Sequence, residues 1–175
     1  MKNAGVLFIC VNCIIFQVKS QVTWSKYIEK KGKIIELILR NGRVSSTKDL
    51  GTYSYITYLD MSLNSLTSLG EINYLTNLTD LLLFSNKIDS FKGLENLTIL
   101  KSLDLSMNKI SYLDDMPPLI NLEILKLASN NIVSLEPLAK LINLQFLFLS
   151  SNQIKSLNGM QALFNLKKVN VLIRK

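Results

Sequence analysis

Apolar and polar residues alternate in short runs along this chain, and the runs return at a constant interval. Around Asp104, leucines occupy positions 103 and 105 while polar residues occupy positions 102 and 106. Such alternation predicts a strand with one apolar face. Both leucine columns recur every 22 residues: Leu37, Leu59, Leu81, Leu103, Leu125, Leu147 and Val169, then Leu39, Met61, Leu83, Leu105, Leu127, Leu149 and Val171. Since one repeat cannot bury its own leucines, we expect the copies to stack about 4.8 Å apart as a parallel sheet over a continuous core.

A polar residue recurs at the same interval, three positions after the second leucine. This column comprises Asn64, Asn86, Asn108, Asn130 and Asn152. The chain has to turn inward after each strand, and an unpaired backbone group in such a turn would cost roughly 1–3 kcal/mol. Because a carboxamide both donates and accepts hydrogen bonds, we predict a structural asparagine ladder that pairs the turn backbones of neighbouring coils.

The return path of each repeat is too short for a long helix. About a dozen residues separate Ile110 from the next strand, and Pro117 and Pro118 interrupt them. Proline lacks an N–H group and favours extended shapes in the residue before it. We therefore expect short 3₁₀ turns and extended segments on the convex side. About six repeats are expected over residues 34–175, and the last one lacks both its asparagine and its return segment.

The residues before the repeats predict two further segments. Residues 21–33 are expected to cap the first coil, with a helix over 23–31 because Trp24, Tyr27 and Ile28 have helical spacing. Residues 1–20 resemble a secretory signal peptide, with a lysine, a short apolar stretch and a polar exit. The alternative for this segment is an apolar strand or helix packed on the core. The protein is expected to be secreted in the first case, and cytoplasmic or nuclear in the second.

The recurring pattern LxxLxLxxNxIxxLxxL resembles the leucine-rich repeat, over about residues 34–175. The 22-residue period is similar to that of the protein phosphatase 1 regulatory subunit and of the bacterial internalins. The resemblance implies an α/β solenoid, a horseshoe with a parallel concave β-sheet. It also implies a non-catalytic module that binds a protein partner, either as a phosphatase-regulator-like scaffold or as a secreted or surface adhesion protein. A third and less favoured alternative is RNA association, which the basic residues near both ends of the chain permit. The fold also resembles that of the spliceosomal A-prime protein.

Composition and charge exclude several kinds of chemistry. The chain has no histidine, which removes Ser-His-Asp and Cys-His catalysis and every histidine-containing zinc site. Its two cysteines, Cys10 and Cys13, lie in an apolar run, where we expect inert thiols. The net charge is +7, but residues 50–150 contain ten acidic and only six basic side chains. A basic groove along the molecule is therefore not expected, and a nucleic acid partner is the less favoured alternative. We predict no enzyme activity, metal, cofactor, small-molecule substrate or membrane span in the mature chain.

The strand positions that alternate with the leucines are the predicted partner-binding residues. They comprise Tyr58, Asp60, Asp80, Leu82, Phe84, Asp104, Ile124, Lys126, Phe146 and Phe148. Leu82 with Phe84 forms one apolar group, and Ile124 with the two other phenylalanines forms a second. Aromatic side chains exposed on a sheet are candidate binding anchors. Asp60 and Asp104 share a column two strands apart, and we expect them to be solvated carboxylates.

A second asparagine column precedes the strands. It comprises Asn77, Asn121, Asn143 and Asn165. Asn77 lies in an Asn-Leu-Thr sequon, but the other three members of its column lack the threonine. The repeat itself therefore accounts for Asn77.

Overall fold

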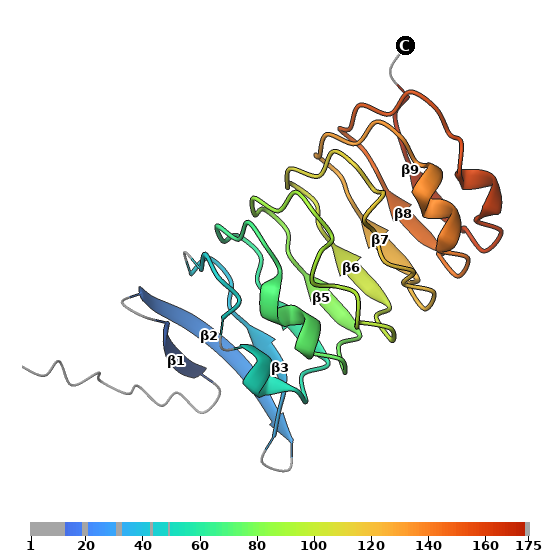
Figure 1. Cartoon of the computed structure of the whole chain (residues 1–175). Helices are drawn as coiled ribbons and strands as arrows, with labels where there is room; N and C mark the ends of the chain where they lie inside the picture. Colours follow the sequence, from blue (N-terminus) through green and yellow to red (C-terminus); the bar gives the residue numbers. More distant parts are fainter. Residues whose placement is uncertain (1–12, 19–20, 31–32, 43, 49, 174–175) are drawn as a thin grey trace, which may run out of the picture.

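The computed structural model describes residues 13–18, 21–30, 33–42, 44–48 and 50–173. Within these ranges, nine strands follow one another in chain order across a single sheet (Figure 1). They are β1 (Cys13–Val18), β2 (Gln21–Lys30), β3 (Lys33–Ile38), β4 (Tyr58–Asp60), β5 (Asp80–Leu82), β6 (Ser102–Asp104), β7 (Ile124–Lys126), β8 (Phe146–Phe148) and β9 (Lys168–Asn170). The seven strands from β3 to β9 are parallel, as the repeat pattern predicts.

The leucine columns set the register of the parallel strands. Leu59, Leu81 and Leu103 lie opposite one another on neighbouring strands, and the pairing continues without a shift to Val169. All the leucines of the first column, from 37 to 147, are fully buried, and the second column from 39 to 149 is buried too. The repeated side chains therefore form one core behind the sheet, to which each coil adds the same layer.

Short 3₁₀ helices and extended segments return the chain from one strand to the next. The helices are η1 (Leu50–Tyr53), η2 (Gly70–Tyr74), η3 (Glu136–Lys140) and η4 (Met160–Ala162). No α-helix occurs in the described ranges. The solenoid architecture and its short 3₁₀ segments are confirmed, and Figure 1 shows the coils stacked in sequence order from the blue end to the red end.

The helix predicted over residues 23–31 is wrong, because β2 occupies this segment. β2 pairs antiparallel with β1 on one side and with β3 on the other, with a bulge between Ile28 and Glu29. β3 offers a row of unpaired backbone groups at the start of the parallel sheet. The segment VTWSKYI, rich in β-branched and aromatic residues, is well suited to pair with that edge. Residues 1–12, 19 and 20 lie outside the described residues. Residues 13–18 form β1, so this part of the segment has the strand conformation named in the alternative. Signal-peptide cleavage stays a prediction.

The last described coil is less covered than the others. β9 pairs with β8, and Val169 is 41% exposed although every earlier member of its column is fully buried. Leu172 and Ile173 are exposed as well. In this structure the core therefore becomes accessible at the β9 end of the stack.

Candidate functional site

The asparagine column forms a continuous hydrogen-bonded ladder. In one rung, Asn130 Oδ1 accepts from the Ile110 backbone N–H at 2.9 Å. Its Nδ2 donates to the carbonyls of Leu105 and Leu127, at 2.9 and 3.1 Å. Asn64, Asn86, Asn108 and Asn152 make the corresponding bonds between their own coils. The carboxamides are thus committed to the turn backbone, and the ladder holds each strand at a fixed position relative to the next.

The residue before each ladder asparagine has a left-handed backbone. These residues are Leu63, Ser85, Met107, Ser129 and Ser151, with φ from 55° to 59°. Non-glycine residues seldom adopt this conformation, and asparagine tolerates it better than most. The sequence did not reveal this turn, because the position lacks a single residue type. The same conformation recurs beside every ladder asparagine, whether the residue is serine, leucine or methionine.

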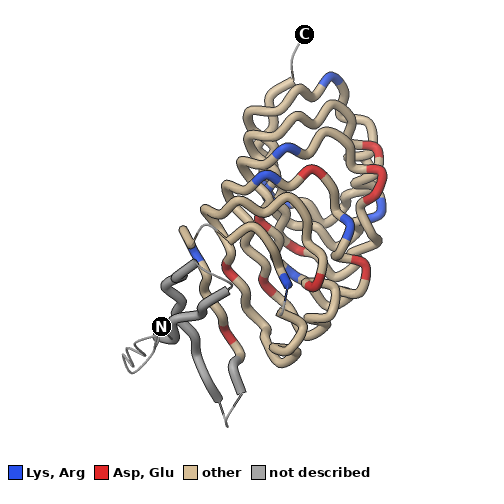
Figure 2. Tube along the Cα trace, turned by 60° about the vertical axis from the view of Figure 1, so that its left-hand side comes forward, with Lys and Arg blue, Asp and Glu red and all other residues tan. Residues whose placement is uncertain are grey.

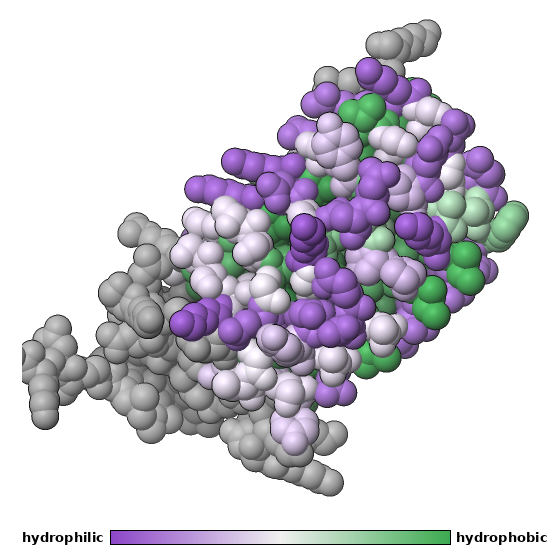
Figure 3. Space-filling view, viewed as in Figure 1, coloured by the Kyte–Doolittle hydropathy of each residue, from purple (hydrophilic) through white to green (hydrophobic). Residues whose placement is uncertain are grey.

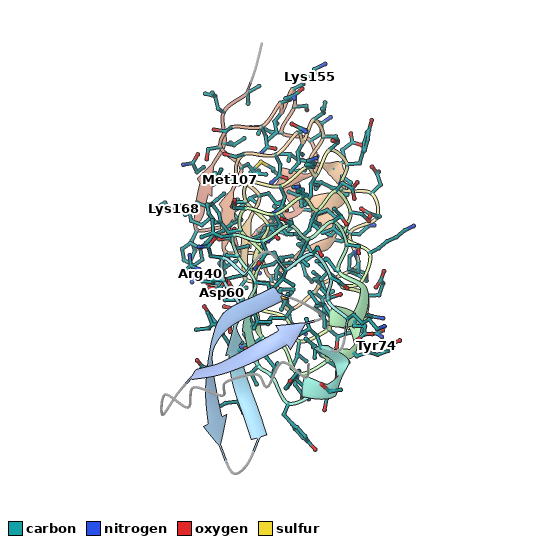
Figure 4. All side chains as sticks on the ribbon, turned by 90° about the vertical axis from the view of Figure 1, so that its left-hand side faces the viewer. Arg40, Asp60, Tyr74, Met107, Lys155 and Lys168 are labelled. Carbon is teal, nitrogen blue, oxygen red and sulfur yellow. The ribbon has the colours of Figure 1, made fainter. Side chains whose placement is uncertain are left out.

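The predicted partner-binding residues lie together on the outer face of the sheet. Tyr58 lies opposite Asp80, and Ile124 lies opposite Phe146 on the neighbouring strand. All ten are half-buried except Asp60, which is 3% exposed. In Figure 4, Arg40, Asp60 and Lys168 lie on one side of the molecule and Tyr74 lies on the opposite side. The predicted residues therefore form one surface of partly accessible side chains on the sheet.

The expectation that Asp60 is solvated is wrong. Its Oδ1 accepts from the Ser62 backbone N–H at 2.9 Å, and its Oδ2 lies 3.4 Å from Arg40 Nε. Asp104 repeats this arrangement two strands later, accepting from the Ser106 N–H at 3.0 Å and pairing with Lys126 at 3.5 Å. Each carboxylate accepts a hydrogen bond from the backbone just after its own strand and pairs with a basic side chain of a neighbouring coil. Asp60 is consequently a structural group as much as a contact residue.

Tyr58 lies in the acidic part of this face. Partial burial raises the pKa of its phenol above the ordinary value, and the nearby Asp60 carboxylate raises that pKa further. Arg40 opposes the shift, while Asp80 and Glu36 add to it. A neutral phenol beside carboxylates offers a hydrogen-bond donor and an aromatic ring to a partner.

The C-terminal part of the face is apolar and cationic. Ile124 and Phe146 are neighbours across β7 and β8, and Phe148 is on the same face two residues further along. Lys126 lies opposite Phe148, and Lys168 Nζ lies 5.9 Å from the centre of the Phe148 ring. An ammonium group at this distance is attracted to the ring face. We call Ile124, Phe146 and Phe148 with these two lysines the aromatic patch.

Charges of both signs are interspersed along the stack rather than gathered into one basic groove (Figure 2). Hydrophilic side chains predominate on the face shown in Figure 3, where hydrophobic groups form small separate areas. Among the described residues, no group of three or more His, Cys, Asp or Glu side chains could hold a metal ion. None of the helices in those ranges has the length and apolar character that crossing a membrane requires.

The second asparagine column also bonds to backbone. Asn77 Nδ2 donates to the Ser54 carbonyl at 2.8 Å, and Asn121 Nδ2 donates to the Thr98 carbonyl at 2.7 Å. Asn143 and Asn165 make the same bond, so these side chains join neighbouring coils on the path that leads into the strands.

Comparison with known proteins places the chain among repeat proteins. The family model described as "Leucine Rich repeats (2 copies)" matches residues 120–168. An internalin (inlF) of Listeria monocytogenes superposes with a TM-score of 0.72 at 25% identity, over 77% of this chain and 40% of that one. An internalin C2 of the same species gives 0.61 at 26% identity, over 78% and 70%. The leucine-rich-repeat protein LIC12759 of Leptospira interrogans gives 0.70 at 29% identity, over 78% and 37%. Curated protein sequences gave no match.

Proposed function

We propose that the concave sheet of this chain binds a protein partner without catalysing a reaction, because the chain has the leucine-rich-repeat fold, which commonly mediates protein–protein interaction. The observation that carries the proposal is the aromatic patch. It places two half-exposed phenylalanines and an isoleucine on adjacent strands, beside two lysines. Aromatic anchors surrounded by charged groups dominate the binding energy of many protein interfaces.

The rest of the face supports selective rather than general binding. Leu82 lies between Asp60 and Asp104 on neighbouring strands, so an apolar side chain is flanked by two carboxylate–cation pairs. Tyr58 and Asp80 add a second polar group near the β4 end. A partner that matches this face needs apolar groups opposite the aromatic patch and hydrogen-bonding or basic groups opposite the tyrosine end. Charge complementarity of this kind adds specificity and speeds association.

Affinity capture with the whole chain tests the proposal. Wild-type protein is compared with a Phe146→Ser, Phe148→Ser variant and with Tyr112→Ser, whose side chain is 75% exposed and lies outside the sheet. We expect a specific protein to be retained by wild type and by Tyr112→Ser and lost from the double variant. The affinity of the purified pair should then fall by more than tenfold, because hot-spot residues contribute over about 1.4 kcal/mol each. Equal retention by all three proteins would exclude the aromatic patch as the binding surface.

The two internalins among the matching structures favour the adhesion-type alternative over a phosphatase-regulator-like scaffold. We propose export of the chain after removal of residues 1–20. Mass spectrometry of the protein isolated from its native cells would then give Gln21 as the first residue. A mature protein that retains Met1 or Lys2 would contradict export by this route.

A further inference from the structure

A polar trough lies beside the sheet, on the path that leads into its last three strands. It is lined by Asn121, Glu123, Asn143, Gln145, Asn165 and Lys167. These side chains come in pairs from three successive repeats, immediately before β7, β8 and β9. The trough is therefore a feature of the C-terminal coils and is separate from the residues of the aromatic patch.

The polar groups of the trough form an ordered chain across the coils. Gln145 Nε2 donates to Glu123 Oε2 at 3.2 Å, and Lys167 Nζ donates to Gln145 Oε1 at 2.8 Å. Lys101 Nζ lies 3.9 Å from Glu123 Oε1 at the other end. The trough thus contains both donors and acceptors, with the Glu123 carboxylate and the Lys167 ammonium group bonded to opposite ends of the Gln145 amide.

The asparagines of the trough are oriented by the fold. Nδ2 of Asn121, Asn143 and Asn165 is held by a carbonyl of the preceding coil, at 2.7 to 2.9 Å. This bond fixes each amide plane and leaves Oδ1 as the group that can accept from a ligand. Three such acceptors follow one another at the spacing of the coils, about 4.8 Å.

Three exposed apolar residues adjoin the asparagines of the trough in the sequence. Ile120, Ile142 and Phe164 each directly precede an asparagine of the lining, and they are 51%, 53% and 90% exposed. Phe164 is the most exposed large hydrophobic side chain among the described residues. Phe164 belongs to neither the buried core nor the asparagine ladder, so its ring is available to a ligand.

We propose that the trough binds a linear, uncharged oligosaccharide. Sugar hydroxyls both donate and accept, which suits amides, a carboxylate and an ammonium group in one row. The apolar faces of sugar rings would pack against Phe164 and the two isoleucines. The spacing of the coils is close to the length of one sugar ring, so successive rings can meet equivalent groups.

The competing ligand classes fit less well. Side chains on one face of an extended peptide recur at about 6.8 Å, twice the rise per residue, and fall out of step with the coils. A nucleic acid strand would need a run of basic groups, but the lining has a single lysine, Lys167, together with the carboxylate of Glu123. A purely apolar ligand would remove the lining carboxylate and amides from water without offering them hydrogen bonds.

Isothermal titration of the whole chain with two uncharged sugars, cellohexaose and hexa-N-acetylchitohexaose, tests this site. We expect wild type to bind at least one of the two, and Phe164→Ala to weaken that binding roughly tenfold because an aromatic platform is lost. Gln145→Ala should weaken it as well, because the variant interrupts the hydrogen-bonded chain. Tyr112→Ala provides the matched control, since it removes an exposed aromatic from the segment that follows β6.

Two results would overturn the proposal. One is the absence of heat from both sugars at millimolar concentration with the folded wild-type chain. The other is binding that Phe164→Ala and Gln145→Ala leave unchanged, or that Tyr112→Ala reduces equally. The Phe146→Ser, Phe148→Ser variant should keep its sugar binding while losing the protein partner. The outcomes for the trough and for the aromatic patch can therefore be told apart.

Discussion

The turn after each strand and the outer face of each strand differ in how strictly they repeat. The turn carries the same asparagine in five successive coils, with the same hydrogen bonds each time. One column of the face reads Asp60, Leu82, Asp104, Lys126 and Phe148 over those coils. A buried turn has few ways to satisfy its backbone, whereas a half-exposed position is not constrained by the fold. Positions that vary on a repeated scaffold are therefore the ones free to specify a partner.

The largest effect is expected when leucines on the buried and the outer face of the sheet are each truncated to alanine. Leu105 is fully buried, and Leu105→Ala should lower the free energy of unfolding by about 2–5 kcal/mol, because a cavity remains. Leu82 is half-buried on the opposite face, and Leu82→Ala should cost only about 1 kcal/mol. Urea denaturation followed by circular dichroism measures both. Equal losses would mean that the assignment of the two faces is wrong.

The next largest effect concerns the ladder itself. Asn130→Ala should cost roughly 1–3 kcal/mol, because it leaves the Ile110 N–H and two carbonyls without their partner. Its sequence neighbour Asn131 is exposed, and Asn131→Ala should stay within about 0.5 kcal/mol of wild type. The same denaturation experiment compares the two variants. If the ladder variant proved as stable as Asn131→Ala, backbone pairing in the turn could not be the reason that the asparagine recurs in every coil.

These two regions also differ in how well the sequence predicts them. The 22-residue period located the strands and the core, because every buried column repeats the same physical demand. The helix expected over residues 23–31 became β2, since the open edge of β3 outweighed the helical spacing of three apolar residues. Solvation of Asp60 was also predicted wrongly, because its bonds to Ser62 and Arg40 depend on the end of a strand and on a neighbouring coil. Asp104 makes the same two kinds of contact, but Leu82 and Lys126 occupy this column in the neighbouring repeats, so the 22-residue pattern gives no sign of these contacts.

A smaller test addresses the left-handed residue before each asparagine. Met107 has a φ of 55° and is half-exposed, so it holds a costly conformation with little packing in return. Met107→Asn should raise the free energy of unfolding by up to about 1 kcal/mol, because asparagine tolerates this region better. Thermal melting compares Met107→Asn with Met107→Leu. Both variants lose the thioether, but only asparagine tolerates the left-handed backbone conformation well. If both substitutions change stability equally, the backbone conformation is not the cause.

The smallest effect concerns Tyr58, because its surroundings on the variable face disfavour the ionised form of its phenol. Burial and Asp60 raise the pKa of this phenol, so in the folded chain it holds its proton to higher pH than it does unfolded. The stability gained from the neutral phenol is therefore complete below about pH 10 and is lost as the pH rises through the folded-state value. Tyr58→Phe cannot ionise, and its urea midpoint should fall less than that of wild type between about pH 8 and pH 11. Tyr112→Phe, changed at an exposed position, should follow wild type over the same range. Parallel curves for wild type and Tyr58→Phe would show that the acidic side chains of this face do not act on the tyrosine, and that the face is more fully hydrated than its burial indicates.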